Sequence, residues 1–91
     1  MTVRVQLPPL LRGLMRGERW LEAEGSSIGA MLADIGARNP SLALHLFDEQ
    51  GAIRHNIAFI HDGEIVRAKQ AATHPLQPGD EIVLTTALAG G

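Results

Sequence analysis

The sequence contains no cysteine and few aromatic residues. Without a thiol, the chain can form no disulfide, no thiolate nucleophile and no cysteine-ligated metal site. Apart from histidine, the aromatic side chains are Trp20, Phe47 and Phe59, or 3% of 91 residues, so a stacking platform for single-stranded nucleic acid is not expected. The formal net charge is −2, whereas nucleic-acid binding normally needs a basic surface. We therefore expect no nucleic-acid partner.

Long hydrophobic runs are also missing. No apolar stretch approaches the ~18–20 residues that cross a membrane, and the alternating residues 1–5 are unlike a signal peptide. We therefore expect a cytoplasmic protein without a membrane partner. The hydrophobic share of 45% is enough for one modest core, and 91 residues fit a single domain.

Residues suited to catalysis are scarce. His45 and His74 have no neighbour at metal-ligand spacing, and His55 and His61 lie on one predicted strand, where their separation is roughly 20 Å. We interpret all four as surface or edge histidines and expect no metal site. No nucleophile elbow, phosphate-binding loop or dinucleotide-binding pattern occurs. The sequence therefore predicts no catalytic residue.

Hydrophobic periodicity in the first half predicts a hairpin followed by a helix. Residues 2–7 and 18–24 alternate as strands do, and the short connection between them indicates an antiparallel pair. Ser27 is placed to cap a helix that ends before Pro40, and residues 41–47 form a short helical turn. The apolar stripe of the main helix has the spacing i, i+3, i+4 and i+7: Ile28, Met31, Leu32 and Ile35.

The second half of the sequence has the pattern of strands connected by turns. Residues 53–60 are the strongest strand, Asp62-Gly63 is a two-residue hairpin signal, and residues 64–68 return as its partner. A tight turn at residues 77–80 leads into a last strand at 81–87. The order of elements predicts an α+β fold, with a mixed sheet of four to five strands and one main helix packed on one face.

The strand at residues 53–60 carries apolar side chains on both faces, so one set must point away from the helix. An exposed apolar patch on a small protein usually marks a partner site. We predict such a patch at Ile57, Phe59 and Val83. Coverage by residues 10–15 is the open alternative.

The last two residues are both glycine. Ten glycines in 91 positions would fall there by chance about once in 100 arrangements, the square of 10/91. Ala89-Gly90-Gly91 is thin enough to enter a narrow tunnel, and its carboxylate, with a reference pKa of ~3.5, is ionised at neutral pH. Such a carboxylate can attack the α-phosphate of ATP in another protein's active site, which gives an acyl-adenylate. A frayed chain end is the alternative.

These features together resemble the MoaD/ThiS family of small sulfur carrier proteins. Residues 76–84, Leu-Gln-Pro-Gly-Asp-Glu-Ile-Val-Leu, are similar to the family's Leu-x-x-Gly-Asp-x-hydrophobic motif, and the terminal Gly-Gly follows at the usual interval. The resemblance covers essentially the whole chain. It implies a ubiquitin-like β-grasp domain at residues 1–87 and a flexible C-terminal tail at residues 88–91.

The resemblance also implies a role as a protein co-substrate rather than an enzyme. A ubiquitin-activating-type adenylyltransferase would use ATP to adenylate Gly91, sulfur would convert it to a thiocarboxylate, and a sulfur-accepting synthase would receive the sulfur. Gly90 and Ala89 would form the threading tail, and Leu88 would help to seat it. The chain itself would bind no cofactor.

The pathway and the final nucleophile remain open. Molybdopterin, thiamin and cysteine biosynthesis are the candidates; the long segments 8–17 and 41–53 look more like the cysteine-forming carriers. A ubiquitin-like modifier, joined to target lysines through Gly91, is the competing interpretation. Lys69 is the sole lysine, so chain building could use only Lys69 or Met1. A plain interaction domain is the third possibility.

Overall fold

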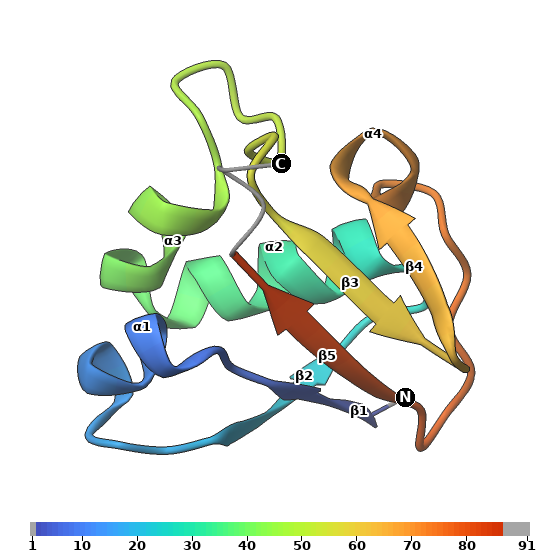
Figure 1. Ribbon diagram of the computed structural model, residues 1–91, viewed down its shortest axis with the longest axis horizontal. Helices are drawn as coiled ribbons and strands as arrows, with labels where there is room; N and C mark the ends of the chain where they lie inside the picture. Colours follow the sequence, from blue (N-terminus) through green and yellow to red (C-terminus); the bar gives the residue numbers. More distant parts are fainter. Residues whose placement is uncertain (1, 87–91) are drawn as a thin grey trace.

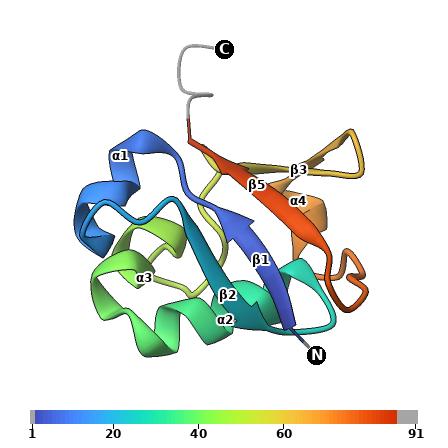
Figure 2. The ribbon, with the colours of Figure 1, turned by 90° about the horizontal axis from the view of Figure 1, so that it is seen from below.

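The structure, a computed structural model, describes residues 2–86. In chain order its elements are β1 (Thr2–Gln6), α1 (Pro9–Arg12), the 3-10 turn η1 (Gly13–Met15), β2 (Trp20–Glu24), α2 (Ile28–Arg38), α3 (Pro40–Leu46), β3 (Ala58–His61), β4 (Glu64–Arg67), α4 (Ala68–Ala71) and β5 (Glu81–Thr85). The five strands form one mixed sheet in the order β2-β1-β5-β3-β4. The main helix, α2, lies across one face of that sheet (Figures 1 and 2). The predicted α+β architecture is confirmed.

The hairpin and the helix form where the sequence predicts them. β1 and β2 pair antiparallel, and the Ser27 hydroxyl accepts the Ala30 N–H at 3.0 Å at the start of α2. α2 ends at Arg38, and α3 begins with Pro40. Proline has no N–H, but the first N–H groups of a helix have no acceptor within it, so proline at this position costs no hydrogen bond. Each member of the predicted stripe of α2 is at most 1% exposed: Ile28, Met31, Leu32 and Ile35.

β1 and β5 come from opposite ends of the chain and pair in parallel at the centre of the sheet. Val5 lies opposite Ile82, and both side chains are fully buried beneath the helical layer. The Arg4 N–H donates to the Asp80 carbonyl at 2.9 Å, just where β5 begins. This pairing closes the sheet around one hydrophobic core.

The predicted strand at residues 53–60 is shorter in the structure, where β3 begins at Ala58. Ahead of β3 the chain is tied to the end of α3 instead of to the sheet. The Arg54 N–H donates to the Leu46 carbonyl at 3.0 Å, and its guanidinium donates to the Leu44 carbonyl at 3.1 Å. These bonds hold the preceding apolar residues in a loop.

The turn between β3 and β4 is as predicted. Asp62 and Gly63 both have positive φ, 52° and 80°, as a two-residue type I′ hairpin turn requires. Ile60 consequently pairs with Ile65, and His61 with Glu64. This register decides which side chains of β3 face the helix.

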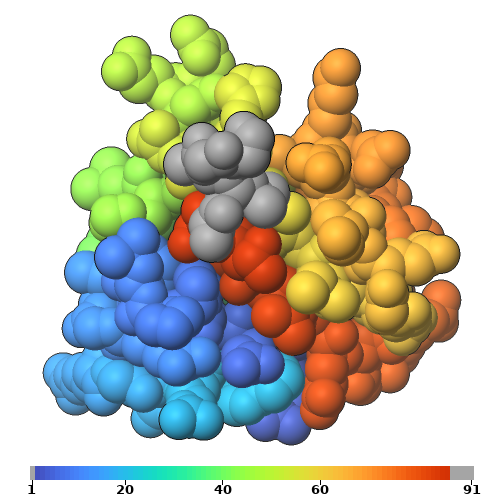
Figure 3. All heavy atoms as spheres, viewed as in Figure 1, coloured from blue at the N-terminus to red at the C-terminus, as the bar shows by residue number. Residues whose placement is uncertain are grey.

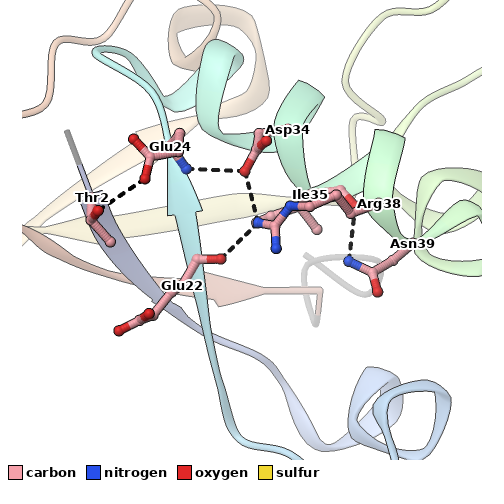
Figure 4. Close-up of polar contacts among 7 residues, drawn as sticks. All are labelled: Thr2, Glu22, Glu24, Asp34, Ile35, Arg38 and Asn39. Atoms are coloured by element: carbon pink, nitrogen blue, oxygen red, sulfur yellow. Dashed lines mark hydrogen bonds and ion pairs between the residues drawn. The ribbon is translucent and has the colours of Figure 1, made fainter.

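A polar network fastens α2 to the edge strand β2 (Figure 4). One carboxylate oxygen of Asp34 accepts the Glu24 N–H at 3.0 Å and the Arg38 guanidinium at 2.7 Å. Arg38 also donates to the Glu22 carbonyl at 2.8 Å. The pKa of Asp34 is lowered, chiefly because the Glu24 N–H binds its ionised form and secondly because Arg38 does.

Two adjacent residues of β3 test the assignment of the faces. Phe59 is fully buried whereas Ile60 is 39% exposed. We expect Phe59→Ala to lower the free energy of unfolding by about 3–5 kcal/mol, because it leaves a cavity, and Ile60→Ala to lower it by roughly 1 kcal/mol or less. Urea unfolding measures both, and Phe59→Leu serves if the alanine variant does not fold. Equal losses at the two positions would contradict the assignment.

The Asp34 network predicts a pH dependence. Since the folded-state pKa of Asp34 is lowered, the folded chain binds fewer protons here than the unfolded chain. The stabilisation is complete above the unfolded value of ~3.9 and is lost as the pH falls through the folded value. Asp34→Asn should therefore unfold at lower urea concentration at pH 7 and lose less stability than wild type between pH 5 and pH 2.

Glu49→Gln, in the exposed turn after α3, is the control for loss of one carboxyl group. Its acid profile should follow that of the wild type. An Asp34→Asn profile parallel to the wild type would mean that the network does not stabilise the ionised carboxylate.

Candidate functional site

The predicted tail, Leu88, Ala89, Gly90 and Gly91, lies outside the described residues, as does the predicted boundary between domain and tail. The described residues end at Thr86, directly after β5, which is the middle strand of the sheet.

The predicted partner patch is wrong for two of its three members. Ile57 and Phe59 are both 0% exposed and belong to the core, so neither can contact a partner. Phe59 pairs with Leu84 of β5, and both side chains point toward α2. Val83 lies on the opposite side of the sheet and is only half-buried.

The sheet surface opposite α2, here called the open face, is on the side of the molecule seen in Figure 3. It carries a different row of residues, most of them apolar. The strand registers align one residue from each of the five strands straight across it: Trp20, Gln6, Val83, Ile60 and Ile65. Ile60 is 39% exposed and Ile65 is 66% exposed. Alternation along residues 57–60 separates the two faces of β3, but the sequence does not reveal which one is covered.

A charged cluster borders the β2 end of this row. The Arg4 guanidinium lies 4.4 Å from the centre of the Trp20 ring and 3.0 Å from the Glu81 carboxylate. Arg4, itself paired with Glu81, thus stacks on the indole at the β2 edge of the open face. The apolar side chains on β5, β3 and β4 lie next to this charged pair on β1 and β5.

A groove of about 460 Å³ joins the open face at the root of the tail. It runs between the β1–α1 connection and the end of β5 and is mostly apolar: Gln6, Leu7, Pro8, Leu10, Val83 and Thr86 are among its lining residues. Leu10 is 76% exposed at its rim. The open face and the groove thus share Gln6 and Val83 and form one continuous surface that reaches Thr86, the last described residue.

The interpretation of all four histidines as surface or edge residues is wrong for His61, which is 8% exposed. Its Nε2 lies 2.8 Å from the Asp80 carboxylate and its Nδ1 lies 2.9 Å from His74 Nε2. The pKa of Asp80 is lowered, first by the Gln77 N–H that it accepts and then by the His61 contact, with desolvation opposing both. His55 lies in the loop before β3, not on the strand.

Within residues 2–86, no three His, Asp or Glu side chains are grouped to hold a metal ion. In that same part of the chain, no helix has the length and apolar character to cross a membrane. The surface just described offers shape and apolar area, which suit protein binding.

Comparison with known proteins identifies one family, one related sequence and two similar solved structures. The model of the ThiS family matches residues 5–91. The sulfur carrier protein CysO of Mycobacterium tuberculosis (strain H37Rv) is 27% identical over 93 residues, covering 100% of both chains. Among solved structures, SAMP1 from Haloferax volcanii has a TM-score of 0.81 at 21% identity over 100% of both chains. The Amycolatopsis orientalis BexX/CysO complex has a TM-score of 0.79 at 24% identity, covering 98% of this chain and 99% of the other. The structural matches confirm the ubiquitin-like β-grasp fold.

Proposed function

The chain belongs to the ThiS family, and from this premise we propose that it is a sulfur carrier whose reactive group is the carboxylate of Gly91. A ubiquitin-activating-type adenylyltransferase supplies the catalytic groups and the ATP. The Gly91 carboxylate attacks the α-phosphate, pyrophosphate leaves, and an acyl-adenylate forms. Hydrosulfide then displaces AMP and leaves a thiocarboxylate. If a partner's persulfide is the donor, it displaces AMP to form an acyl disulfide, and a thiol then releases the thiocarboxylate by forming a disulfide with the donor. Because this step consumes ATP, we place it in the cytoplasm.

The observation that carries the proposal is the match of the family model through to Gly91, with CysO, a named sulfur carrier, similar over its full length. The described residues support the proposal because the tail follows β5, the middle strand of the sheet. Six residues, 86–91, follow β5 and reach at most ~22 Å beyond it when fully extended. That is long enough to place Gly91 in a partner's active site while the body of the domain stays outside.

Glycine suits the end of such a tail for a steric reason. A nucleophile must approach the Gly91 carbonyl carbon after adenylation, and a side chain on that residue would crowd the approach. Gly90 and Ala89 keep the remainder of the tail narrow. Leu88 provides the apolar contact that seats the tail at the entrance to the partner.

We further propose that the open face and the adjoining groove dock the adenylyltransferase. Val83 stays in the predicted patch, and Ile60 and Ile65 replace Ile57 and Phe59. The row crosses β5 at Val83, so a partner bound there would lie next to the end of β5, the strand that precedes the tail. The same surface can present the thiocarboxylate to a sulfur-accepting synthase after the first partner has left.

Among the candidate pathways we propose the cysteine-forming one. The long segments 8–17 and 41–53, which prompted this preference in the sequence, are ordered parts of the fold that carry α1, η1 and α3. The 27% identity to CysO extends over these segments as well. The acceptor of the sulfur would then be an activated amino-acid precursor.

Conjugation to proteins is the second candidate, and the likeness to SAMP1 favours it. A solved structure from Methanosarcina acetivorans, with a TM-score of 0.79, is likewise a small archaeal modifier protein. Adenylation of Gly91 would be identical in that case. The lysine amine of a target, in place of hydrosulfide, would displace AMP and form an isopeptide bond.

Addition of one residue after Gly91 is expected to abolish adenylation. The terminal carboxylate would then belong to the added residue and would be displaced from its position in the partner's active site. Pyrophosphate release with the activating enzyme measures the reaction, and circular dichroism checks that the fold is unchanged. One extra residue before Met1 is the matched control and should leave the rate unaltered. Adenylation that survives the extension would refute the terminal-carboxylate mechanism.

Intact-mass analysis of protein from its native cell separates the two candidates. A carrier should show replacement of one oxygen by sulfur, removed by treatment that hydrolyses thiocarboxylates. A modifier should instead give higher-mass adducts joined through Gly91. If deletion of Gly90 and Gly91 leaves the cell's phenotype untouched, both functions fail.

Substitution of two aliphatic residues with similar exposure, one on the open face and one on α3, tests the docking surface. Ile65 on the open face is 66% exposed and Leu44 on α3 is 73% exposed. Ile65→Asp should raise the KM of the activating enzyme for the carrier by about fivefold or more, because a charge replaces apolar contact area in the interface. Leu44→Asp should leave that KM within about twofold of wild type. The reverse ranking would place the interface on the helical side.

A further inference from the structure

Three polar side chains form a hydrogen-bonded chain at the base of β5, away from the root of the tail. His61 is the last residue of β3, His74 lies between α4 and β5, and Asp80 immediately precedes β5. The His61 ring bridges the other two, at 2.9 Å from His74 and 2.8 Å from Asp80. The two rings meet edge to face, with centroids 5.0 Å apart and planes at 89°.

The contacts fix where the protons lie. Asp80 is held ionised by the Gln77 N–H at 2.8 Å, which lowers its pKa, so its carboxylate can only accept from His61 Nε2–H. The other ring nitrogen of neutral His61, Nδ1, then has a lone pair. His74 must supply the Nε2–H that this lone pair accepts. The arrangement at neutral pH is therefore His74 to His61 to Asp80, donor to acceptor.

The segment that these side chains hold is also fastened through its backbone. The His74 carbonyl accepts the Ile28 N–H at 2.9 Å at the start of α2, and the Leu76 N–H donates to the Ser26 carbonyl at 2.9 Å. Residues 74–80 thus connect α2, β3 and the first residue of β5. Release of His74 from His61 would loosen one of the side-chain anchors of this segment.

We propose that the His74–His61–Asp80 chain is a pH-sensitive latch, which accepts one additional proton when closed and opens to accept a second. The first proton fits on His74 Nδ1, because both hydrogen bonds stay in place. A second proton puts an N–H on each of the two facing nitrogens, where a separation of 2.9 Å leaves neither a lone pair to accept. The pair must then part.

Nearby charges favour binding of the first proton, but they do not remove the N–H against N–H contact that the second proton creates. Asp62 has a carboxylate oxygen 3.7 Å from His61 Nε2 but is 82% exposed, and Glu64 faces His61 across the β3–β4 pair. On β5, the other strand paired with β3, Glu81 is paired with the Arg4 guanidinium of β1, and α4, which contacts β3, carries Lys69. The acidic neighbours stabilise an imidazolium, whereas the N–H against N–H contact is local and steric.

The direction of the pH effect follows from counting protons. The unfolded chain has room for a second proton on each imidazole, whereas the closed hydrogen-bond arrangement has room for only one additional proton on the pair. The folded state is therefore destabilised as the pH falls, by up to about tenfold in the unfolding equilibrium constant per pH unit. The lowered carboxyl pKa values of Glu24, Asp34 and Asp80 act in a separate window, below about pH 4.

Urea unfolding of the full chain at pH 7 and pH 5 tests the latch, with His74→Gln as the variant and His45→Gln, on α3, as the control. The glutamine amide cannot be protonated. It can donate to neutral His61 through its NH2 group and, after rotation, accept from protonated His61 through its oxygen, so that protonation of His61 no longer requires the pair to part. From pH 7 to pH 5 we expect the unfolding equilibrium constant of wild type and His45→Gln to rise roughly tenfold or more. In His74→Gln the rise should be several-fold smaller. An undiminished rise in His74→Gln would overturn the proposal.

A spectroscopic measurement tests the same idea without a variant. Nitrogen-15 NMR of the imidazoles should show His61 as the Nε2–H tautomer at pH 7.5. At pH 5, hydrogen exchange at the Leu76 and Gln77 amides, corrected for intrinsic rates, should accelerate more than exchange in β1. Two doubly protonated rings at pH 5 in a segment that keeps its protection would equally overturn the proposal.

Discussion

The parallel pairing of β1 with β5 is the constraint on which the rest of the structure depends. These strands lie more than 70 residues apart in sequence, since Arg4 is aligned with Glu81, and they occupy the middle of the sheet. Their side chains supply the floor of the core, where Val5 and Ile82 are fully buried. The β1–β2 hairpin and the β3–β4 hairpin are each local, and only β5 joins them. A chain that lost this pairing would keep two hairpins without a shared core.

A central last strand also explains how one small domain separates stability from binding. One face of β5 packs Ile82 and Leu84 against the helical layer, and the other presents Val83 beside Ile60. Because β5 has neighbours on both sides, the segment after it leaves from the interior of the sheet and not from an edge. The root of the tail is therefore flanked by the open face and by the groove under α1. If the proposed partner binds the apolar row, it lies next to the end of β5, the strand that precedes the tail.

Features set by local interactions could be predicted from the sequence, and features set by register could not. The Ser27 cap, the buried stripe of α2 and the Asp62-Gly63 turn depend on residues a few positions apart. The face of β3 that is buried depends on a pairing register, and a shift of one residue would exchange Phe59 with Ile60. The loop before β3 depends on the Arg54 bonds to α3 carbonyls, which hydrophobic periodicity does not detect. The burial of His61 likewise needs partners that lie 13 and 19 residues along the chain.

The same distinction gives a physical meaning to the motif by which the sequence resembles its family. Asp80 is its most polar member, yet it lies at the start of β5 and at the opposite end of that strand from the tail. Its carboxylate accepts the Gln77 N–H and the His61 imidazole, and its carbonyl accepts the Arg4 N–H of β1. Three bonds at one residue thus join the preceding turn, β3 and β1 to the first position of the central strand. The motif therefore closes the sheet and fixes in place the strand that leads toward Gly91, the proposed reactive residue.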